Sequence, residues 1–285
     1  MRIERQSSAN GFVPVELLAI FTIVILLASI ALPTIARFKA KMLTTKCLNN
    51  HRQLARAFQL YATDNDGRCP NNFIIPDTER AIITSQYNNW ANNIMTWSAS
   101  GTVVDRSVTN VDWAAKSLLH PYTDGDIAIY SCPADNYISP VQKARGYKRR
   151  VRSIAMNAVL GANSFVAGSN AGRSWGWGGQ YRQFLKLRDV ANPAKTWLTI
   201  DEHPDSLNDG FFITEGLQYW GDFPGTLHGN GTSFSFVDGH VEFHLWRGRA
   251  TRVRVNFGYQ FTQRTDDATR RDLKWYNERV GLVRY

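Results

Sequence analysis

Residues 17–36 read LLAIFTIVILLASIALPTIA, and residues 37–63 continue as RFKAKMLTTKCLNNHRQLARAFQLYAT. The first stretch contains no charged residue, and twenty helical residues span about 30 Å, the thickness of a bilayer core. The second stretch repeats apolar residues at helical spacing, namely Leu43, Cys47, Leu54, Phe58 and Tyr61. These patterns predict one long helix that is apolar over residues 12–36 and amphipathic over residues 37–67, with its second half packed on a globular domain.

The composition restricts the class of protein. The chain has 285 residues, of which 44% are hydrophobic and 20% are charged, so it is not a disordered chain. Its mean hydropathy of −0.32 excludes a protein with many membrane spans. The 33 basic residues against 24 acidic ones give a net charge of +9. Because the basic residues are spread along the chain, they do not favour a nucleic-acid partner, and anionic lipids or glycans explain the charge as well.

The apolar stretch has two interpretations. One is an ordinary secretory signal, with Ser29-Ile30-Ala31 as a small-residue cleavage site. The other is a lasting anchor, because Glu16 stands at the head of the apolar run, where a carboxylate is costly and usually functional. A cleaved signal is normally followed by a break, whereas here the helical pattern continues.

The segment Gly11-Phe12-Val13-Pro14-Val15-Glu16 resembles the processing motif of type IV prepilins and type II secretion pseudopilins. The resemblance implies that residues 1–11 are a leader, that a prepilin peptidase cleaves between Gly11 and Phe12, and that the new N-terminal Phe12 is methylated. It also implies that Glu16 pairs with the N-terminal amine of a neighbouring subunit during filament assembly. Pro33 falls where the family often has a helix-kinking proline, while Pro14 departs from the usual Leu.

The sequence of the rest of the chain, residues 68–285, predicts a globular α+β domain with long loops rich in Trp and Gly. Strand-like stretches occupy residues 127–132, 151–158 and 196–201. Residues 232–237 and 240–246 are also strand-like, and the Asp238-Gly239 dipeptide between them favours a type I′ turn. We therefore expect the long helix to pack on an antiparallel sheet that ends in this hairpin.

Four short segments extend the resemblance to prepilin-like proteins over most of the chain. His228, nine residues and then Asp238-Gly239 match the pattern called H-X9-DG in that group. The other segments are Cys47-Leu48-Asn49-Asn50, Cys132-Pro133-x-Asp135 and the acidic stretch from Asp201 to Asp209. The resemblance brings no biochemical role for these segments.

The acidic stretch is the candidate metal site. Its acidic members are Asp201, Glu202, Asp205 and Asp209, with His228 and Asp238 as residues that the fold could bring near. Hard oxygen ligands suit Ca²⁺, and the resemblance adds that major pseudopilins hold a structural Ca²⁺. The alternative is that these side chains cap turns and accept hydrogen bonds from backbone amides.

The three cysteines are far apart in the sequence and form no Cys-x-x-Cys motif. Cys47 and Cys132 could pair in a disulfide that ties the helix to the body, since an extracytoplasmic location permits one. The alternative is that both are buried free thiols. The sequence has no nucleophile motif and no phosphate-binding glycine loop, so we do not expect an enzyme.

The sequence thus predicts a pilin-like subunit that a single helix anchors in a bacterial inner membrane, with its body outside the cytoplasm. It would assemble into a type II secretion pseudopilus or a type IV pilus-like filament. Its partners would be prepilin peptidase, other pilin or pseudopilin subunits, and inner-membrane components of the secretion system. The alternative is a membrane-anchored or secreted binding module for a glycan or surface polymer, because aromatic faces stack on sugars. Its platform would be Trp90, Trp97, Trp175, Trp177 and Trp220.

Overall fold

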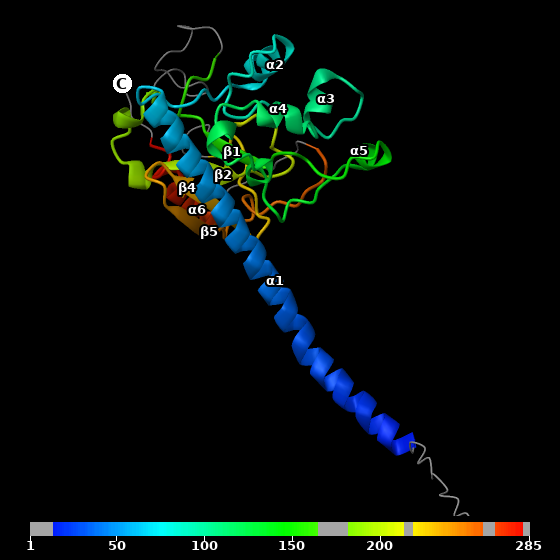
Figure 1. The fold of residues 1–285 in the computed structure, drawn as a ribbon. Helices are drawn as coiled ribbons and strands as arrows, with labels where there is room; N and C mark the ends of the chain where they lie inside the picture. Colours follow the sequence, from blue (N-terminus) through cyan, green and yellow to red (C-terminus); the bar gives the residue numbers. More distant parts are fainter. Residues whose placement is uncertain (1–13, 165–181, 214–218, 259–265, 282–285) are drawn as a thin grey trace, which may run out of the picture. The chain divides into compact units, whose positions relative to one another are not determined.

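The computed structural model describes residues 14–164, 182–213, 219–258 and 266–281. The chain divides into two units, residues 1–42 and residues 43–285. The described elements include a long helix, five strands and a series of short helices between them (Figure 1). The shorter helical elements are α2 (Ile75–Ile83), α3 (Val103–Ser107), α4 (Val111–Ala115), η1 (His120–Tyr122), η2 (Ile127–Tyr130), α5 (Pro140–Ala144), η3 (Leu187–Asp189), η4 (Pro193–Lys195) and α6 (Asp267–Asn277).

The predicted long helix is confirmed as α1 (Pro14–Asp64), which contains Pro33 in its interior. It ends three residues earlier than the sequence suggested, because Asp66 and Gly67 adopt positive φ angles of 54° and 73°. The Gly67 amide donates a hydrogen bond back to the Ala62 carbonyl, 2.8 Å away, which closes the last turn.

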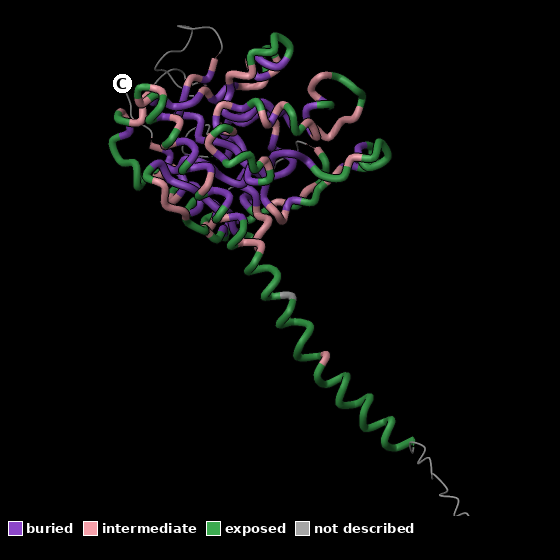
Figure 2. The backbone as a smooth tube through the Cα atoms, viewed as in Figure 1, coloured by how far each residue is buried: buried purple, intermediate pink, exposed green. Residues whose placement is uncertain are grey.

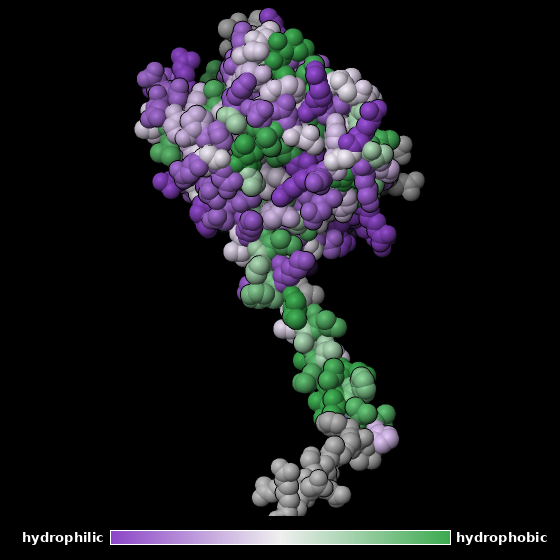
Figure 3. Space-filling model, turned by 45° about the vertical axis from the view of Figure 1, so that its right-hand side comes forward, coloured by the Kyte–Doolittle hydropathy of each residue, from purple (hydrophilic) through white to green (hydrophobic). Residues whose placement is uncertain are grey.

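In the first unit, α1 is apolar and its side chains are exposed. An 18-residue window of this helix has a mean hydropathy of 2.7, and none of that window is buried. Figures 2 and 3 show the same segment as exposed in the tube view and as hydrophobic in the space-filling view. By length and composition this helix could cross a membrane.

In the second unit, five strands form one mixed sheet in the order β3-β1-β2-β4-β5. Their bounds are β1 (Ile154–Asn157), β2 (Trp197–Asp201), β3 (Phe211–Phe212), β4 (Gly231–Phe236) and β5 (Val241–Leu245). The expectation of a wholly antiparallel sheet is wrong, since β1 and β3 pair in parallel. The reason is that β2 ends at Asp201 beside Ile154, where β1 begins. The chain that leaves this end of β2 crosses to the free edge of β1 and continues there as β3. Because it comes from the end where β1 begins, β3 runs in the same direction as β1.

The predicted hairpin is confirmed, because β4 and β5 pair antiparallel from Gly231↔Leu245 to Ser235↔Val241. Its turn differs from the expected type I′, in which both central residues have positive φ. Here Gly239 has a φ of 98°, whereas Asp238 is not among the residues with positive φ. The Gly239 amide donates to the Phe236 carbonyl at 2.9 Å, which makes a three-residue loop with glycine in the left-handed position.

Two helices cover opposite faces of the sheet, and alternate residues of β4 mark the two faces. Ser235 contacts the Thr199 hydroxyl, which lies 2.7 Å from His51 of α1. Phe234 instead packs against Trp275 of α6, with ring centroids 5.4 Å apart. All residues of β1 to β4 are therefore buried, whereas the residues of β5, at one edge of the sheet, are exposed or partly exposed.

One expected strand is absent. Residues 127–132 form the short helix η2 and the turn after it, because the Asp126 side chain accepts a hydrogen bond from the Ala128 amide and caps a helical turn. The apolar side chains Ile129 and Tyr130 are buried in this conformation, so the apolar pattern that suggested a strand is satisfied by a helical turn.

Candidate functional site

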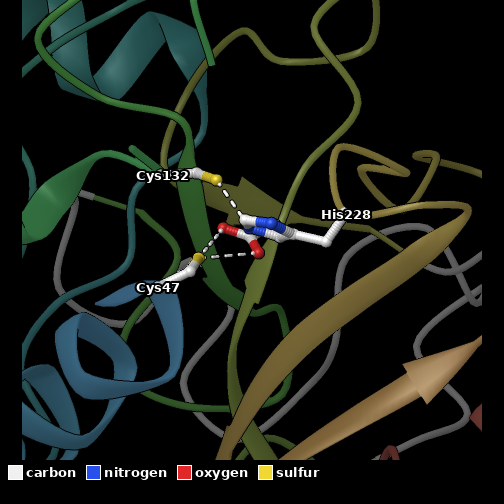
Figure 4. Close-up of side chains that lie close together, drawn as sticks. Cys47, Cys132 and His228 are labelled. Atoms are coloured by element: carbon white, nitrogen blue, oxygen red, sulfur yellow. Dashed lines mark hydrogen bonds between the residues drawn. The ribbon is translucent and has the colours of Figure 1, made fainter. Parts of the chain in front are cut away.

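Four side chains from four distant segments converge between α1 and the sheet (Figure 4). Cys47 lies on α1, Cys132 follows η2, Asp201 ends β2, and His228 stands in the loop before β4. One sulfur, nitrogen or oxygen atom from each lies within 4.8 Å of those of the others. No second group of this kind occurs in the part of the chain that the structure describes.

The contacts inside this four-residue cluster are short. The Cys47 thiol donates to both oxygens of Asp201, with distances of 3.2 Å to Oδ1 and 3.1 Å to Oδ2. The Cys132 sulfur lies 3.0 Å from His228 Nε2. Cys47, Cys132 and Asp201 are completely buried, and His228 is partly exposed. The cluster therefore has one edge near solvent and three members inside the protein.

Further residues hold two of these four side chains, Asp201 and Cys132, in place. His51 lies one helical turn after Cys47 and places Nε2 3.3 Å from Asp201 Oδ1, while its Nδ1 lies 2.7 Å from Thr199 Oγ1. The Ser233 amide donates to Asp201 Oδ2 at 3.3 Å. The Ala134 amide donates to the Cys132 sulfur at 3.4 Å. Asp201 and Cys132 are thus oriented by contacts from outside the cluster, which come from the helix, the sheet and a turn.

The pKa values of the two thiols shift in opposite directions. Burial raises the pKa of Cys47 well above its usual value, and the nearby Cys132 and Asp201 raise it further. Burial also acts to raise the pKa of Cys132, but the neighbouring Cys47 side chain and the His228 imidazole outweigh it, so this pKa is lowered. Cys132 is therefore the more readily ionised thiol.

The pKa values of the two other members, His228 and Asp201, shift in the directions that favour their charged forms. Burial acts to lower the pKa of His228, yet the contact with Cys132 outweighs it and the pKa is raised. Burial acts to raise the pKa of Asp201, yet His51 outweighs it and the pKa is lowered. The charged forms of Asp201 and His228 are thus stabilised by their neighbours rather than by water.

The structure brings only two members of the predicted acidic set into this cluster, Asp201 and His228. Glu202 accepts from the Ser206 hydroxyl at 2.6 Å, and burial raises its pKa to about 8. Asp209 accepts from the Phe211 amide at 2.9 Å. Asp205 accepts from Trp97 Nε1 at 2.9 Å and from the Asn256 amide at 2.8 Å.

Asp238 lies on the exposed hairpin and accepts from the His240 amide at 3.2 Å. Glu202, Asp205, Asp209 and Asp238 therefore act as hydrogen-bond acceptors, as the alternative interpretation expected. They belong to no metal-capable group among the described residues.

All three cysteines are free thiols, so the structure does not contain the suggested Cys47–Cys132 disulfide. The sulfurs of Cys47 and Cys132 nevertheless both lie in the cluster. Sequence reasoning missed their association with Asp201 and His228. A signal was present, since each of the four short segments singled out in the sequence contributes one residue to the cluster: Cys47, Cys132, Asp201 and His228.

The predicted row of exposed tryptophans does not form in the described residues. Trp90 and Trp220 are buried, with exposed fractions of 0% and 2%. Trp97 is partly buried, with Arg150 4.5 Å above its ring and Phe257 against its edge. These rings pin loops onto the domain, as buried aromatic side chains commonly do. Trp175 and Trp177 lie outside the described residues.

The predicted processing site, Gly11 and Phe12, also lies outside the described residues. Glu16 is described, and it occupies the first turn of α1 as an exposed side chain. A carboxylate in the first turn of a helix interacts favourably with the helix dipole.

No family model matches this chain, and none of the curated proteins or solved structures that were compared with it does so either.

Proposed function

We propose that this protein is a pilin-like structural subunit that a single N-terminal helix anchors in a bacterial inner membrane, with residues 43–285 outside the cytoplasm. A prepilin peptidase cleaves it between Gly11 and Phe12, and Phe12 is then methylated. The mature chain assembles with other pilin or pseudopilin subunits, and with inner-membrane components of the secretion system, into a type II secretion pseudopilus or a type IV pilus-like filament.

The observation that carries this proposal is the two-part character of α1. Its first part has apolar side chains that are exposed, which fits a lipid or filament-core environment. Its later residues, such as Leu54 and Phe58, are completely buried in the core of the globular unit. A cleaved secretory signal gives no reason for one helix to combine these two roles.

Glu16 supports the assembly role. It stands in the first turn of α1 and is followed by apolar residues as far as Ala36 apart from a few hydroxyls. A carboxylate among apolar side chains is stable when it finds a cationic partner. The N-terminal amine of a neighbouring mature subunit would supply that partner.

The first test is the intact mass and N-terminal sequence of the chain extracted from membranes of cells with and without prepilin peptidase. We expect a chain that starts at Phe12 and carries one additional methyl group, found only when the peptidase is present. A chain that starts at Leu32 would instead identify ordinary signal-peptidase cleavage and would contradict the proposal. A chain that keeps Met1 in both strains would identify a plain membrane anchor and would contradict it too.

A substitution separates assembly from processing. Glu16→Gln should be cleaved normally but should enter filaments more than tenfold less efficiently, because removing one partner of a buried ion pair costs about 3–5 kcal/mol. The recovery of the chain in sheared filaments, relative to its amount in the membrane, measures this effect. Thr34→Val is the control, since Thr34 only donates to the Ile30 carbonyl within the same helix. Equal recovery of both variants would contradict the role of Glu16.

A further inference from the structure

We propose that Cys47, Cys132, Asp201 and His228 form a structural zinc site that fastens helix α1 to the sheet and to two loops. All four residues belong to the globular unit, residues 43–285. The proposal goes beyond the pilin-like function and does not depend on it, because it concerns the cohesion of this unit wherever the chain resides.

The donor set favours zinc over the calcium that the acidic stretch suggested. Two cysteine sulfurs, one imidazole nitrogen and one carboxylate oxygen are ligand types that Zn²⁺ accepts in tetrahedral sites. Calcium takes six to eight oxygen ligands, and this cluster offers a single carboxylate. Four protein donors leave no open position, which is the arrangement of structural rather than catalytic zinc sites.

The distances fit a tetrahedral ion after small side-chain shifts. With bonds of about 2.3 Å to sulfur and about 2.0 Å to nitrogen or oxygen, the ligand atoms of a zinc tetrahedron lie about 3.3–3.8 Å apart. The cluster has Cys47–Asp201 contacts of 3.1 and 3.2 Å and a Cys132–His228 contact of 3.0 Å. All of its donor atoms lie within 4.8 Å of one another. The ligand atoms are therefore already about as far apart as in a zinc tetrahedron, and the ion would replace the hydrogen bonds between them.

Outer contacts typical of zinc sites are already present. Metal ligands are usually oriented by a second layer of hydrogen bonds. His51 Nε2 lies 3.3 Å from Asp201 Oδ1, so a buried imidazole that is not itself a member of the cluster contacts the carboxylate. The Ala134 amide points at the Cys132 sulfur, which favours a thiolate there.

The cluster has one edge near solvent, at His228. A groove of about 690 Å³ is lined by Ala134, two residues after Cys132, and by Leu227, next to His228. His228 is the partly exposed member of the cluster. An ion could enter past this imidazole, while the completely buried thiols and carboxylate would shield it afterwards.

The test uses the full-length chain, purified in detergent under reducing conditions, incubated with zinc and freed of unbound metal by gel filtration. We expect about one zinc per chain by elemental analysis. Replacement with Co²⁺ should give thiolate-to-cobalt charge-transfer absorption and the intense visible bands of a tetrahedral ion. A chelator should lower the unfolding temperature of the loaded wild-type chain, because an ion that binds only the folded state stabilises it.

Matched variants locate the ion. Cys132→Ser and His228→Ala should lose at least tenfold in zinc affinity and should lose the sensitivity of their unfolding temperature to chelator. Cys69→Ser is the control, because Cys69 is likewise a buried free thiol but lies outside the cluster. If a cluster variant fails to fold, the metal content, the cobalt spectrum and the chelator effect of the wild-type chain still decide the matter.

Three results would overturn the proposal. The first is a reduced chain that takes up neither zinc nor cobalt, which would leave the cluster as a hydrogen-bonded core. The second is a Cys47–Cys132 disulfide, found by mass spectrometry, in protein isolated without reductant. The third is zinc that stays bound in Cys132→Ser and His228→Ala to the same extent as in Cys69→Ser.

Discussion

His244 is a residue whose environment decides its protonation. It lies on β5 and stacks on the Trp275 ring, with centroids 3.6 Å apart. Burial lowers its pKa to about 4, and the positive charge of Arg279 acts in the same direction. The imidazole is therefore neutral in the folded chain under conditions in which it would be charged in the unfolded chain.

This lowered pKa predicts a pH dependence of stability. Between pH 6.5, the ordinary value for histidine, and about pH 4, the unfolded chain binds more protons than the folded chain. The contribution of His244 to stability is therefore complete above pH 6.5 and decreases as the pH falls toward about 4. Thermal unfolding at a series of pH values should show a smaller acid-induced loss for His244→Phe, which keeps an aromatic ring on Trp275. Parallel pH profiles of the two proteins would contradict this assignment.

The backbone conformation and packing at position 161 require glycine. Its φ is +80°, and a Cβ atom there would overlap the carbonyl oxygen of Pro70. Gly161→Ala should therefore lower the free energy of unfolding by about 2–5 kcal/mol, from backbone strain together with the steric overlap.

The matched control is Gly101→Ala. Gly101 also has a positive φ, +89°, but a Cβ there meets no atom within 4 Å. This variant should lose only the free energy of unfolding that comes from backbone strain, about 1–2 kcal/mol. Urea unfolding of both variants measures the difference, and equal losses would show that the overlap with Pro70 is relieved by movement of the chain.

At the scale of elements, Arg152 ties strand β1 to two distant loops. Its completely buried guanidinium donates to the carbonyls of Ile154, Asn93 and Asn208 at 2.9–3.1 Å. Burial lowers the pKa of Arg152 to about 10, while Glu202 and Asp209 act to raise it. The side chain thus joins backbone segments that no strand pairing connects.

Arg152→Met should be strongly destabilising. The Ile154 and Asn93 carbonyls would lose this donor, whereas the Asn208 carbonyl keeps the Met95 amide. Each buried carbonyl left without a donor costs about 1–3 kcal/mol, so the total loss should be about 2–6 kcal/mol. The expected result is a large decrease in the urea concentration at the unfolding midpoint. Arg188→Met is the control, because Arg188 is exposed and should change stability by less than about 0.5 kcal/mol. Similar midpoints for the two variants would contradict the role of Arg152.

At the scale of the whole molecule, the globular unit has a core of its own. The main cluster of buried apolar residues begins at Leu54 and ends at Val280, so all of its members lie within residues 43–285. We expect a chain of residues 43–285 to fold without detergent and to keep the near-ultraviolet circular dichroism of its buried tryptophans. Loss of this signal, or aggregation of the shortened chain, would show that residues 1–42 are needed for folding.

Elements with a strong local pattern were predictable from the sequence. Helix α1 followed from a helical repeat of apolar residues, and the β4–β5 hairpin followed from two strand-like runs around Asp238-Gly239. The strand expected at residues 127–132 was wrong, because the Asp126 cap favoured a helical turn there. The parallel pairing of β1 with β3 was not predictable either, since it depends on where the chain re-enters the sheet.

The sequence by itself determined the long two-part helix, the α+β class and the hairpin, because helix and strand periodicities involve neighbours along the chain. Only the tertiary structure decided which side chains meet. Cys47, Cys132, Asp201 and His228 come from a helix, a turn, a strand end and a loop, and the contacting residues Cys47 and Asp201 are 154 positions apart in the sequence. The acidic neighbours of Asp201 had the same local appearance as Asp201 itself. Their side chains diverge because each turn of the backbone after β2 directs them to different amides and hydroxyls.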